Sequence, residues 1–236
     1  KKADANLIHT STLSVSGNTM GDNFDGFVSE TEKHFYESSL YIEQPLDNVY
    51  ARSKFEAEKA VIEAMADGVK ANICRMGNLT NRYSDGKFQY NYETNAFAQR
   101  VKALLELGKL PEYMMKLYVE YTPIDDAAGA VMAIARHFNT KYNVFHVNSH
   151  KVVSFDKLLA YFAKLGIDMK IIGGKEFAEI LRETAKQTNT EYIFETFIND
   201  MDEDEMLNYD SNIRIENDYT VDYLKKIGFE WSDIGL

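Results

Sequence analysis

The chain has 236 residues, of which 45% are hydrophobic, 13% aromatic and 27% charged, a composition that is typical of a folded protein and excludes disordered, collagen-like and coiled-coil chains. The formal net charge of −11 disfavours nucleic acid as a partner, and the single cysteine, Cys74, excludes an internal disulfide. No apolar run approaches the roughly 20 residues that cross a bilayer, so we expect a cytoplasmic protein without a membrane partner.

The first third of the chain predicts strands and a helix in alternation. Residues 6–12 read as a buried strand, and residues 16–48 lack a clean period and read as a long loop. Apolar residues recur at helical spacing over 49–67, where Gly68 follows as a C-terminal cap. Residues 69–76 form a second apolar strand, and this order is typical of a parallel α/β sheet.

The same alternation continues through the middle of the chain, with no linker rich in proline, glycine and serine between its parts. Further elements are predicted as a helix at 94–107 with a Thr94 cap, an extended segment at 117–121, a small-residue helix at 127–138 opened by Asp125 or Asp126, a strand at 143–148, a helix from Ser154 to Leu165, a strand at 169–172 and mostly helix from 175 onward.

A tyrosine and a lysine on the first predicted helix are the leading candidates for chemistry. Tyr50 and Lys54 are four residues apart and therefore share a helical face. An ammonium beside a phenol stabilises the phenolate, so the pair can act as a general acid. The spacing is common, since Tyr83 and Lys87 repeat it, but an Asp-Gly turn separates that second pair.

Hydroxyl groups end the strand that precedes this helix. Thr10, Ser11 and Thr12 are its last residues, and ligands in open α/β folds bind at the carboxyl ends of strands. Thr12 is the predicted third member of the site, with Ser11 as its rival.

In this order and context the residues resemble the extended short-chain dehydrogenase/reductase superfamily, whose motif is a strand-end Ser or Thr followed by Tyr-x-x-x-Lys. Within it, the chain most resembles the terminal thioester reductase domains of nonribosomal peptide synthetases, which are related to carboxylic acid reductase and fatty acyl reductase domains. The resemblance rests on 11–15, 50–58, 75–86, 121–128 and 145–148. Its most specific part is Arg75-Met76-Gly77-Asn78-Leu79-Thr80, where sugar-modifying members usually carry Pro-Gly.

The resemblance implies a role for each of these side chains. Tyr50 would protonate the substrate carbonyl oxygen, Thr12 would hold the same oxygen, and Lys54 would bind the nicotinamide ribose. The implied catalytic residues are Thr12, Tyr50 and Lys54, and the implied cofactor-binding residues are Thr10, Ser11, Tyr50, Lys54, Met76, Gly77 and Asn78.

The resemblance also implies the substrate and the partner. The cofactor would be NADPH, and the substrate a peptidyl or acyl thioester on the phosphopantetheine arm of an upstream carrier domain, released as an aldehyde with a further reduction to the alcohol as an option. Two alternatives stay open. One is an NAD-dependent sugar-nucleotide epimerase or dehydratase of the same superfamily, and the other is a non-catalytic fragment that cannot bind cofactor alone.

The implied fold is the second part of a Rossmann-type doubly wound parallel sheet with a smaller, mostly helical C-terminal substrate lobe. Gly17, Gly21 and Gly26 do not match the glycine-rich turn that grips the pyrophosphate, so we expect this N-terminal segment to be absent and NADPH to bind the chain weakly. The predicted domains are 1–135, with 76–120 contributing in part to the substrate lobe, and 136–236, with a returning strand near 143–148.

No metal site is expected. His9, His146 and His150 lack a second ligand at suggestive spacing and are predicted to be structural. The acidic run Asp200, Asp202, Glu203, Asp204 and Glu205 is predicted to be a solvated segment.

Overall fold

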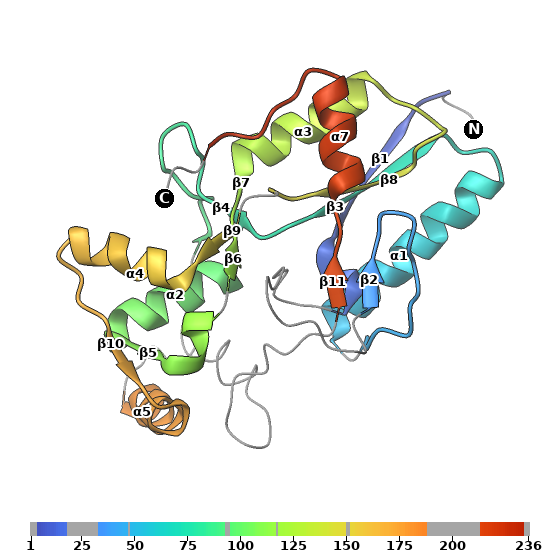
Figure 1. Ribbon diagram of the computed structural model, residues 1–236. Helices are drawn as coiled ribbons and strands as arrows, with labels where there is room; N and C mark the ends of the chain where they lie inside the picture. The colour runs from blue at the N-terminus through green and yellow to red at the C-terminus, as the bar shows by residue number, and fades with distance from the viewer. Residues whose placement is uncertain are drawn as a thin grey trace. The chain divides into compact units, whose positions relative to one another are not determined.

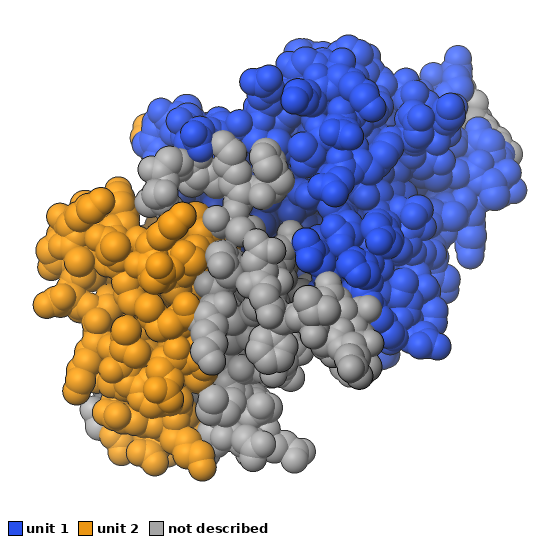
Figure 2. Space-filling model, in the orientation of Figure 1, with its two compact units in different colours: residues 1–86, 120–152, 212–234 blue, residues 87–119, 153–211, 235–236 orange. Residues whose placement is uncertain are grey.

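The computed structural model (Figure 1) describes residues 4–17, 33–46, 48–92, 95–116, 118–149, 152–187 and 213–233. The chain forms two compact units (Figure 2), the first made of 1–86, 120–152 and 212–234, the second of 87–119, 153–211 and 235–236. The units interleave along the sequence. The predicted domains also interleave, since 1–135 has 76–120 contributing in part to the substrate lobe and 136–236 has a returning strand near 143–148. That division into functional domains stays a prediction.

The first unit is organised around a parallel sheet of three strands. They are β1 (Leu7–Thr12), β3 (Ala71–Met76) and β8 (Val144–Val147), in the order β1-β3-β8. In this register Ser11 lies opposite Arg75 and Thr12 lies opposite Met76, so the carboxyl ends of β1 and β3 are adjacent. The parallel α/β class predicted from the alternation of elements is confirmed.

Helices cover both faces of this sheet, and successive strand residues point to opposite faces. Cys74 packs with Ala130 and Ile134 of α3 (Ile124–Arg136) and with Leu224 of α7 (Asp218–Lys226). The next residue, Arg75, faces α1 (Val49–Ala66) instead. Cys74 of β3 is therefore in an apolar cluster, while Arg75 carries a charge to the opposite face.

Two pairs of short parallel strands complete the first unit. β2 (Lys33–Phe35) pairs with β11 (Ile213–Ile215), and β4 (Leu79–Thr80) pairs with β7 (Thr122–Pro123). The prediction of continuous loop over 16–48 is wrong at β2, and the mostly helical prediction from 175 onward is wrong at β11. Strands of three residues have too few positions to show a period, and distant partners stabilise them.

The second unit contains the other elements and pairs β5 with β10 in parallel. Its elements are α2 (Ala96–Leu107), β5 (Lys109–Pro111), the 3₁₀ helix η3 (Glu112–Lys116), α4 (Phe155–Lys164), β10 (Lys170–Ile172) and α5 (Gly174–Gln187), while β6 (Tyr118–Glu120) and β9 (Val152–Ser154) lie where the chain passes from one unit to the other. The predicted helices at 94–107 and 154–165 are confirmed, whereas α3 begins at Ile124, three residues before the predicted start at 127.

Several predictions fall outside the described residues. Gly21, Gly26, His150 and the acidic run at 200–205 all lie there. The predicted Thr94 cap of α2 is wrong, because Asn95 is the N-cap and its side-chain oxygen accepts from the Ala98 N–H at 3.0 Å. Gly17, which is described, ends the 3₁₀ helix η1 (Leu13–Ser16) with φ of +83°. Within the described ranges, no helix has the length and apolar character that crossing a membrane requires.

Helix α1 begins with a side-chain cap that bears on the candidate site. The Asn48 side-chain oxygen accepts hydrogen bonds from the backbone N–H groups of Tyr50, at 2.8 Å, and Ala51, at 3.3 Å. These donors have no partner inside the helix, so the cap stabilises the turn that carries Tyr50.

We expect Asn48→Ala to lower the free energy of unfolding by about 1 kcal/mol, because the two N–H groups lose their acceptor. Asn48→Asp keeps an acceptor oxygen and serves as the control. Chemical denaturation of the three proteins measures the effect. An alanine variant as stable as the aspartate variant would show that the cap contributes nothing.

Candidate active site

The candidate site is built on one face of α1. Tyr50, Lys54 and Glu58 follow one another at four-residue intervals, so they form a single stripe along the helix. The stripe runs from the surface into the core, since Tyr50 is 54% exposed and Glu58 is 0% exposed. The Lys54 ammonium donates a hydrogen bond of 3.4 Å to the backbone carbonyl of Thr10 on β1. The structure thus brings Lys54 to the strand that ends in the predicted hydroxyl groups.

The two rival hydroxyl groups at the end of β1 have different surroundings. Ser11 is buried and donates a 2.5 Å hydrogen bond to Oε1 of Glu58. The Thr12 hydroxyl lies at the start of η1, where it accepts from the Ser14 N–H and donates to the Ser14 hydroxyl, both at 3.2 Å. Ser11 is therefore committed to a buried carboxylate, while the bonds that Thr12 makes within the described residues are both long and go to Ser14. The assigned roles of both residues stay predictions.

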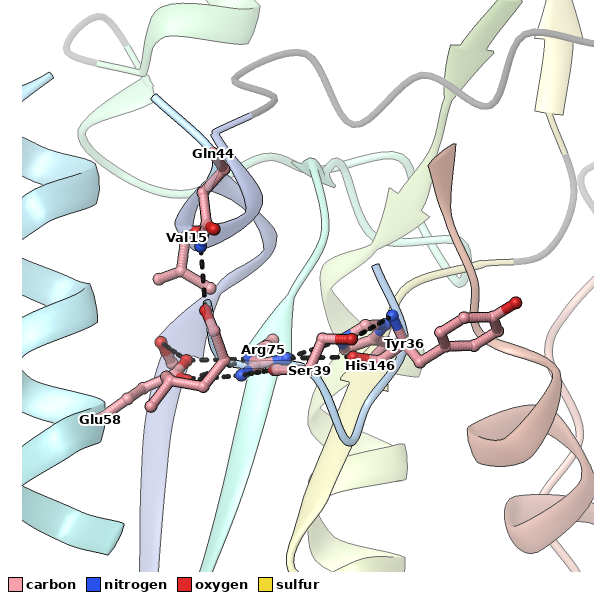
Figure 3. Close-up of polar contacts among 9 residues, drawn as sticks. Val15, Tyr36, Ser39, Gln44, Glu58, Arg75 and His146 are labelled. Carbon is pink, nitrogen blue, oxygen red and sulfur yellow. Dashed lines mark hydrogen bonds and ion pairs between the residues drawn. The ribbon is translucent and has the colours of Figure 1, made fainter. Parts of the chain in front are cut away.

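Beneath the stripe lies a buried ion pair (Figure 3). Arg75 donates from Nε to both oxygens of Glu58, at 3.0 and 3.1 Å, and from Nη2 to Oε2 at 2.8 Å. Nη2 also donates to the carbonyl of Ser39 at 2.8 Å, and Nη1 approaches Nε2 of His146 at 3.0 Å and the carbonyl of Tyr36 at 3.5 Å. These acceptors surround all three nitrogens of the guanidinium, as a buried arginine requires.

His146 completes this network as a neutral side chain. Arg75 can only donate, so Nε2 of His146 is the acceptor and Nδ1 donates to the carbonyl of Glu216 at 2.6 Å. Burial, helped by the neighbouring Arg75 charge, lowers the pKa of His146 to about 3. The His146 ring stacks on the Phe35 ring with 5.6 Å between centroids, and the Arg75 guanidinium lies 4.7 Å from the centroid of the Phe35 ring. The structural role predicted for this histidine is confirmed.

The turn that follows β3 is held by its backbone. The Gly77 N–H donates to the carbonyl of Val147 at 3.1 Å, and the Asn78 N–H donates to Oε2 of Glu120 at 2.9 Å. A Cβ atom on Gly77 would lie 2.4 Å from Oε1 of Glu120 and 2.5 Å from Cβ of Asn148. Glycine is thus required here by close packing.

Glu120 is a buried carboxyl that the sequence did not point to. It accepts from the Asn78 N–H and from the Thr122 hydroxyl, whose oxygen in turn accepts from the Ser149 N–H at 2.8 Å. Within the described part of the chain no cationic side chain pairs with it, and burial raises its pKa from near 4.5 to about 7. An acidic residue in an apolar strand was the only available signal, because burial depends on the fold.

The side chains of the site fit a nicotinamide cofactor in part. Lys54 uses one hydrogen bond on Thr10, so its ammonium has further donors for a ribose hydroxyl, and the Tyr50 residue is exposed. The N–H groups of Gly77 and Asn78 are already paired, so this turn would offer a packing surface and not those donors. The described residues contain no group of three His, Cys, Asp or Glu side chains placed to hold a metal ion.

This fold is shared with NAD(P)-dependent reductase domains. The chain belongs to the NAD-binding family described as "Male sterility protein", whose model matches residues 1–131.

Solved structures extend the likeness to nearly the whole chain. A thiolation-reductase di-domain from an archaeal non-ribosomal peptide synthetase is 30% identical with a TM-score of 0.75, over 97% of this chain and 46% of that one. The reductase domain of the aureusimine biosynthetic cluster is 29% identical with a TM-score of 0.75, over 99% of this chain and 57% of that one. The resemblance to terminal reductase domains inferred from the sequence is confirmed.

Among curated proteins, the large subunit of L-2-aminoadipate reductase from Candida glabrata is 25% identical over 78% of this chain and 15% of its own length. The chain thus spans about half of the solved structures and a small part of this curated relative.

Glu120→Gln tests the environment of the buried carboxyl. Because the folded-state pKa is raised, wild-type Glu120 favours folding when protonated, and this contribution is lost as pH rises from about 4.5 to about 7. We expect the free energy of unfolding of the wild type, measured relative to Glu120→Gln, to fall by about 3 kcal/mol across that range, at 1.36 kcal/mol per pK unit. Denaturation of both proteins at a series of pH values measures it. A constant difference would contradict the assignment.

Gly77→Ala tests the packing of the turn. We expect it to lower the free energy of unfolding by about 1–3 kcal/mol, because the new methyl group meets Glu120 and Asn148, both buried. Gly173→Ala is the matched control, since a Cβ atom there meets nothing within 4 Å. Equal stability of the two variants in chemical denaturation would show that the turn has room for a side chain.

Proposed function

We propose that the protein is a thioester reductase, which uses NADPH to release a carrier-bound peptidyl or acyl group as an aldehyde. The observation that carries the proposal is the 3.4 Å hydrogen bond from Lys54 on α1 to the Thr10 carbonyl on β1. This bond sets the Tyr50–Lys54 face against the strand that ends in Thr12. Family membership and the likeness to synthetase reductase domains support the same reading.

The reaction balances without a metal or a covalent intermediate on the protein. NADPH, when bound, supplies a hydride to the thioester carbonyl carbon. Tyr50 gives its proton to the carbonyl oxygen, so the substrate becomes a hemithioacetal. Breaking of the carbon–sulfur bond then yields the aldehyde and the carrier thiol. The sum is thioester plus NADPH plus a proton, giving aldehyde, thiol and NADP⁺.

The other two side chains would act on charge and orientation. The Thr12 hydroxyl would turn from Ser14 to donate to the carbonyl oxygen as negative charge develops there. The Lys54 ammonium, held by Thr10, would bind the ribose hydroxyl and stabilise the Tyr50 phenolate after proton transfer. The phenol is exposed, so it can recover its proton from solvent.

The proposed partner is a carrier domain that presents the thioester on a phosphopantetheine arm. Two relatives support this choice by their descriptions. The archaeal structure joins a thiolation domain to its reductase domain, and a subunit of the linear gramicidin synthase of Brevibacillus parabrevis is 24% identical over 60% of this chain. A carrier upstream in the native protein would deliver the substrate directly.

Tyr50→Phe tests the proposed general acid in the protein encoded by the native gene. We expect kcat for NADPH oxidation with an acyl-phosphopantetheine thioester to fall about 10²–10⁴-fold, because the phenol that donates the proton is gone. Tyr83→Phe is the matched control, since Tyr83 is equally exposed, at 54%, and also precedes a lysine by four residues.

The assay follows NADPH absorbance and traps the aldehyde as an oxime. Wild-type turnover in the tyrosine 50 variant would remove that residue from the mechanism. A wild-type protein that interconverts a sugar nucleotide without net NADPH consumption would instead support the epimerase alternative.

A further inference from the structure

The buried carboxylate of Glu58 joins three elements just beneath the proposed reaction centre. Ser11 of β1 and Arg75 of β3 are opposite each other in the sheet, and both donate to this one carboxylate from α1. Ser11 is followed at once by Thr12, and Glu58 lies one helical turn after Lys54. Arg75 is two residues before the glycine of the turn. Thr12, Lys54 and Gly77 are therefore each within four residues of a member of this cluster.

The cluster constrains the rotation of α1 about its axis. Each residue of an α-helix occupies about 100° around the helix axis. A rotation of α1 about its axis would therefore move Glu58 away from Arg75 and Ser11. Glu58 and Arg75 are 0% and 1% exposed, so neither could find water as a substitute partner. A separated pair would leave a buried charge, which costs several kcal/mol. Tyr50 and Lys54, on the same stripe, share the rotation that Glu58 sets.

The same guanidinium organises the segment that passes beside the strand end. Arg75 donates to the carbonyls of Tyr36 and Ser39, and further along this segment Gln44 donates to the carbonyl of Val15, in η1, at 2.9 Å (Figure 3). The Arg75 guanidinium thus binds both α1, through Glu58, and the 36–39 segment, through two backbone carbonyls.

A contribution to stability alone does not account for an ion pair in this position. Apolar residues of similar volume in place of a buried pair are often neutral or stabilising. What a forked guanidinium and a carboxylate add is a fixed mutual orientation. A reaction centre assembled from a helix and two strands needs such an orientation, because a misplacement of about 1 Å can reduce a rate about 10²-fold.

We propose that Ser11, Glu58 and Arg75 are positioning residues that set the rotation of α1, and with it the placement of Tyr50 and Lys54 relative to Thr12. The proposal rests on the proposed function and adds to it the residues that align the general acid.

The test replaces the polar cluster by apolar side chains in the protein encoded by the native gene. The variant combines Ser11→Ala, Glu58→Met and Arg75→Met. The matched control is Ile134→Ala on α3, a buried position in the apolar cluster that contains Cys74, with an expected loss of about 2–5 kcal/mol. Both are assayed at a temperature at which denaturation curves show them fully folded.

We expect kcat for thioester reduction to fall about 10²-fold in the triple variant and to stay within about twofold of wild type in Ile134→Ala. Hydrogen exchange gives a second readout without substrate. It should accelerate over 50–58 in the triple variant and over 124–136 in the control. Wild-type kcat together with unchanged exchange over 50–58 would overturn the proposal.

Two further outcomes are decided by the same measurements. If the wild type itself reduces no thioester, the proposed function fails, and exchange over 50–58 alone decides the positioning role. If the triple variant does not fold, Ser11→Ala replaces it, since this change keeps the ion pair and removes one of its anchors. A severalfold lower kcat with faster exchange over 50–58 then supports the proposal, and no change in either overturns it.

Discussion

The buried charge of Arg75 is the constraint on which the first unit depends. A guanidinium at 1% exposure must find acceptors for its donors inside the protein, and they come from α1, from the 36–39 segment and from β8. Burial, together with the Arg75 charge, keeps His146 neutral. The Glu58 carboxylate that binds Arg75 also accepts from Ser11 and joins the helix that carries Tyr50 to the sheet. Residues far apart in the sequence thus meet as hydrogen-bond acceptors of the Arg75 guanidinium.

A second buried carboxyl shows the opposite solution. Glu58 has a cation at 2.8 Å, whereas the partners of Glu120 among the described residues are an N–H and a hydroxyl, and burial raises its pKa to about 7. The first carboxylate orients a helix through charge. The second holds a tight turn by hydrogen bonding. Glu58 thus contacts the strands through Ser11 and Arg75, and Glu120 contacts the turn that follows β3.

The fold was predictable where the chain carries a local signal. The 49–67 helix has an apolar period and a following glycine, and each of the strands β1, β3 and β8 includes apolar residues, so these elements were expected close to their observed bounds. β2 and β11 were missed because each has three residues and is stabilised by the other, across most of the chain. The start of α3 was placed late, since Ile124 precedes the acidic residues that suggested a cap.

The sequence by itself determined the candidate chemistry of this protein, since residue type and spacing place Tyr50 and Lys54 on one helical face after a strand that ends in hydroxyl groups. Only the tertiary structure decided which groups are committed elsewhere. Ser11 and Thr12 are adjacent in the sequence and both carry a hydroxyl group. The Ser11 hydroxyl binds Glu58 in the core, whereas the Thr12 hydroxyl lies at the strand end. Burial and partner choice depend on elements that meet in space, so Glu58, Arg75 and Glu120 became recognisable as a support for the site only once the sheet and its helices were in place.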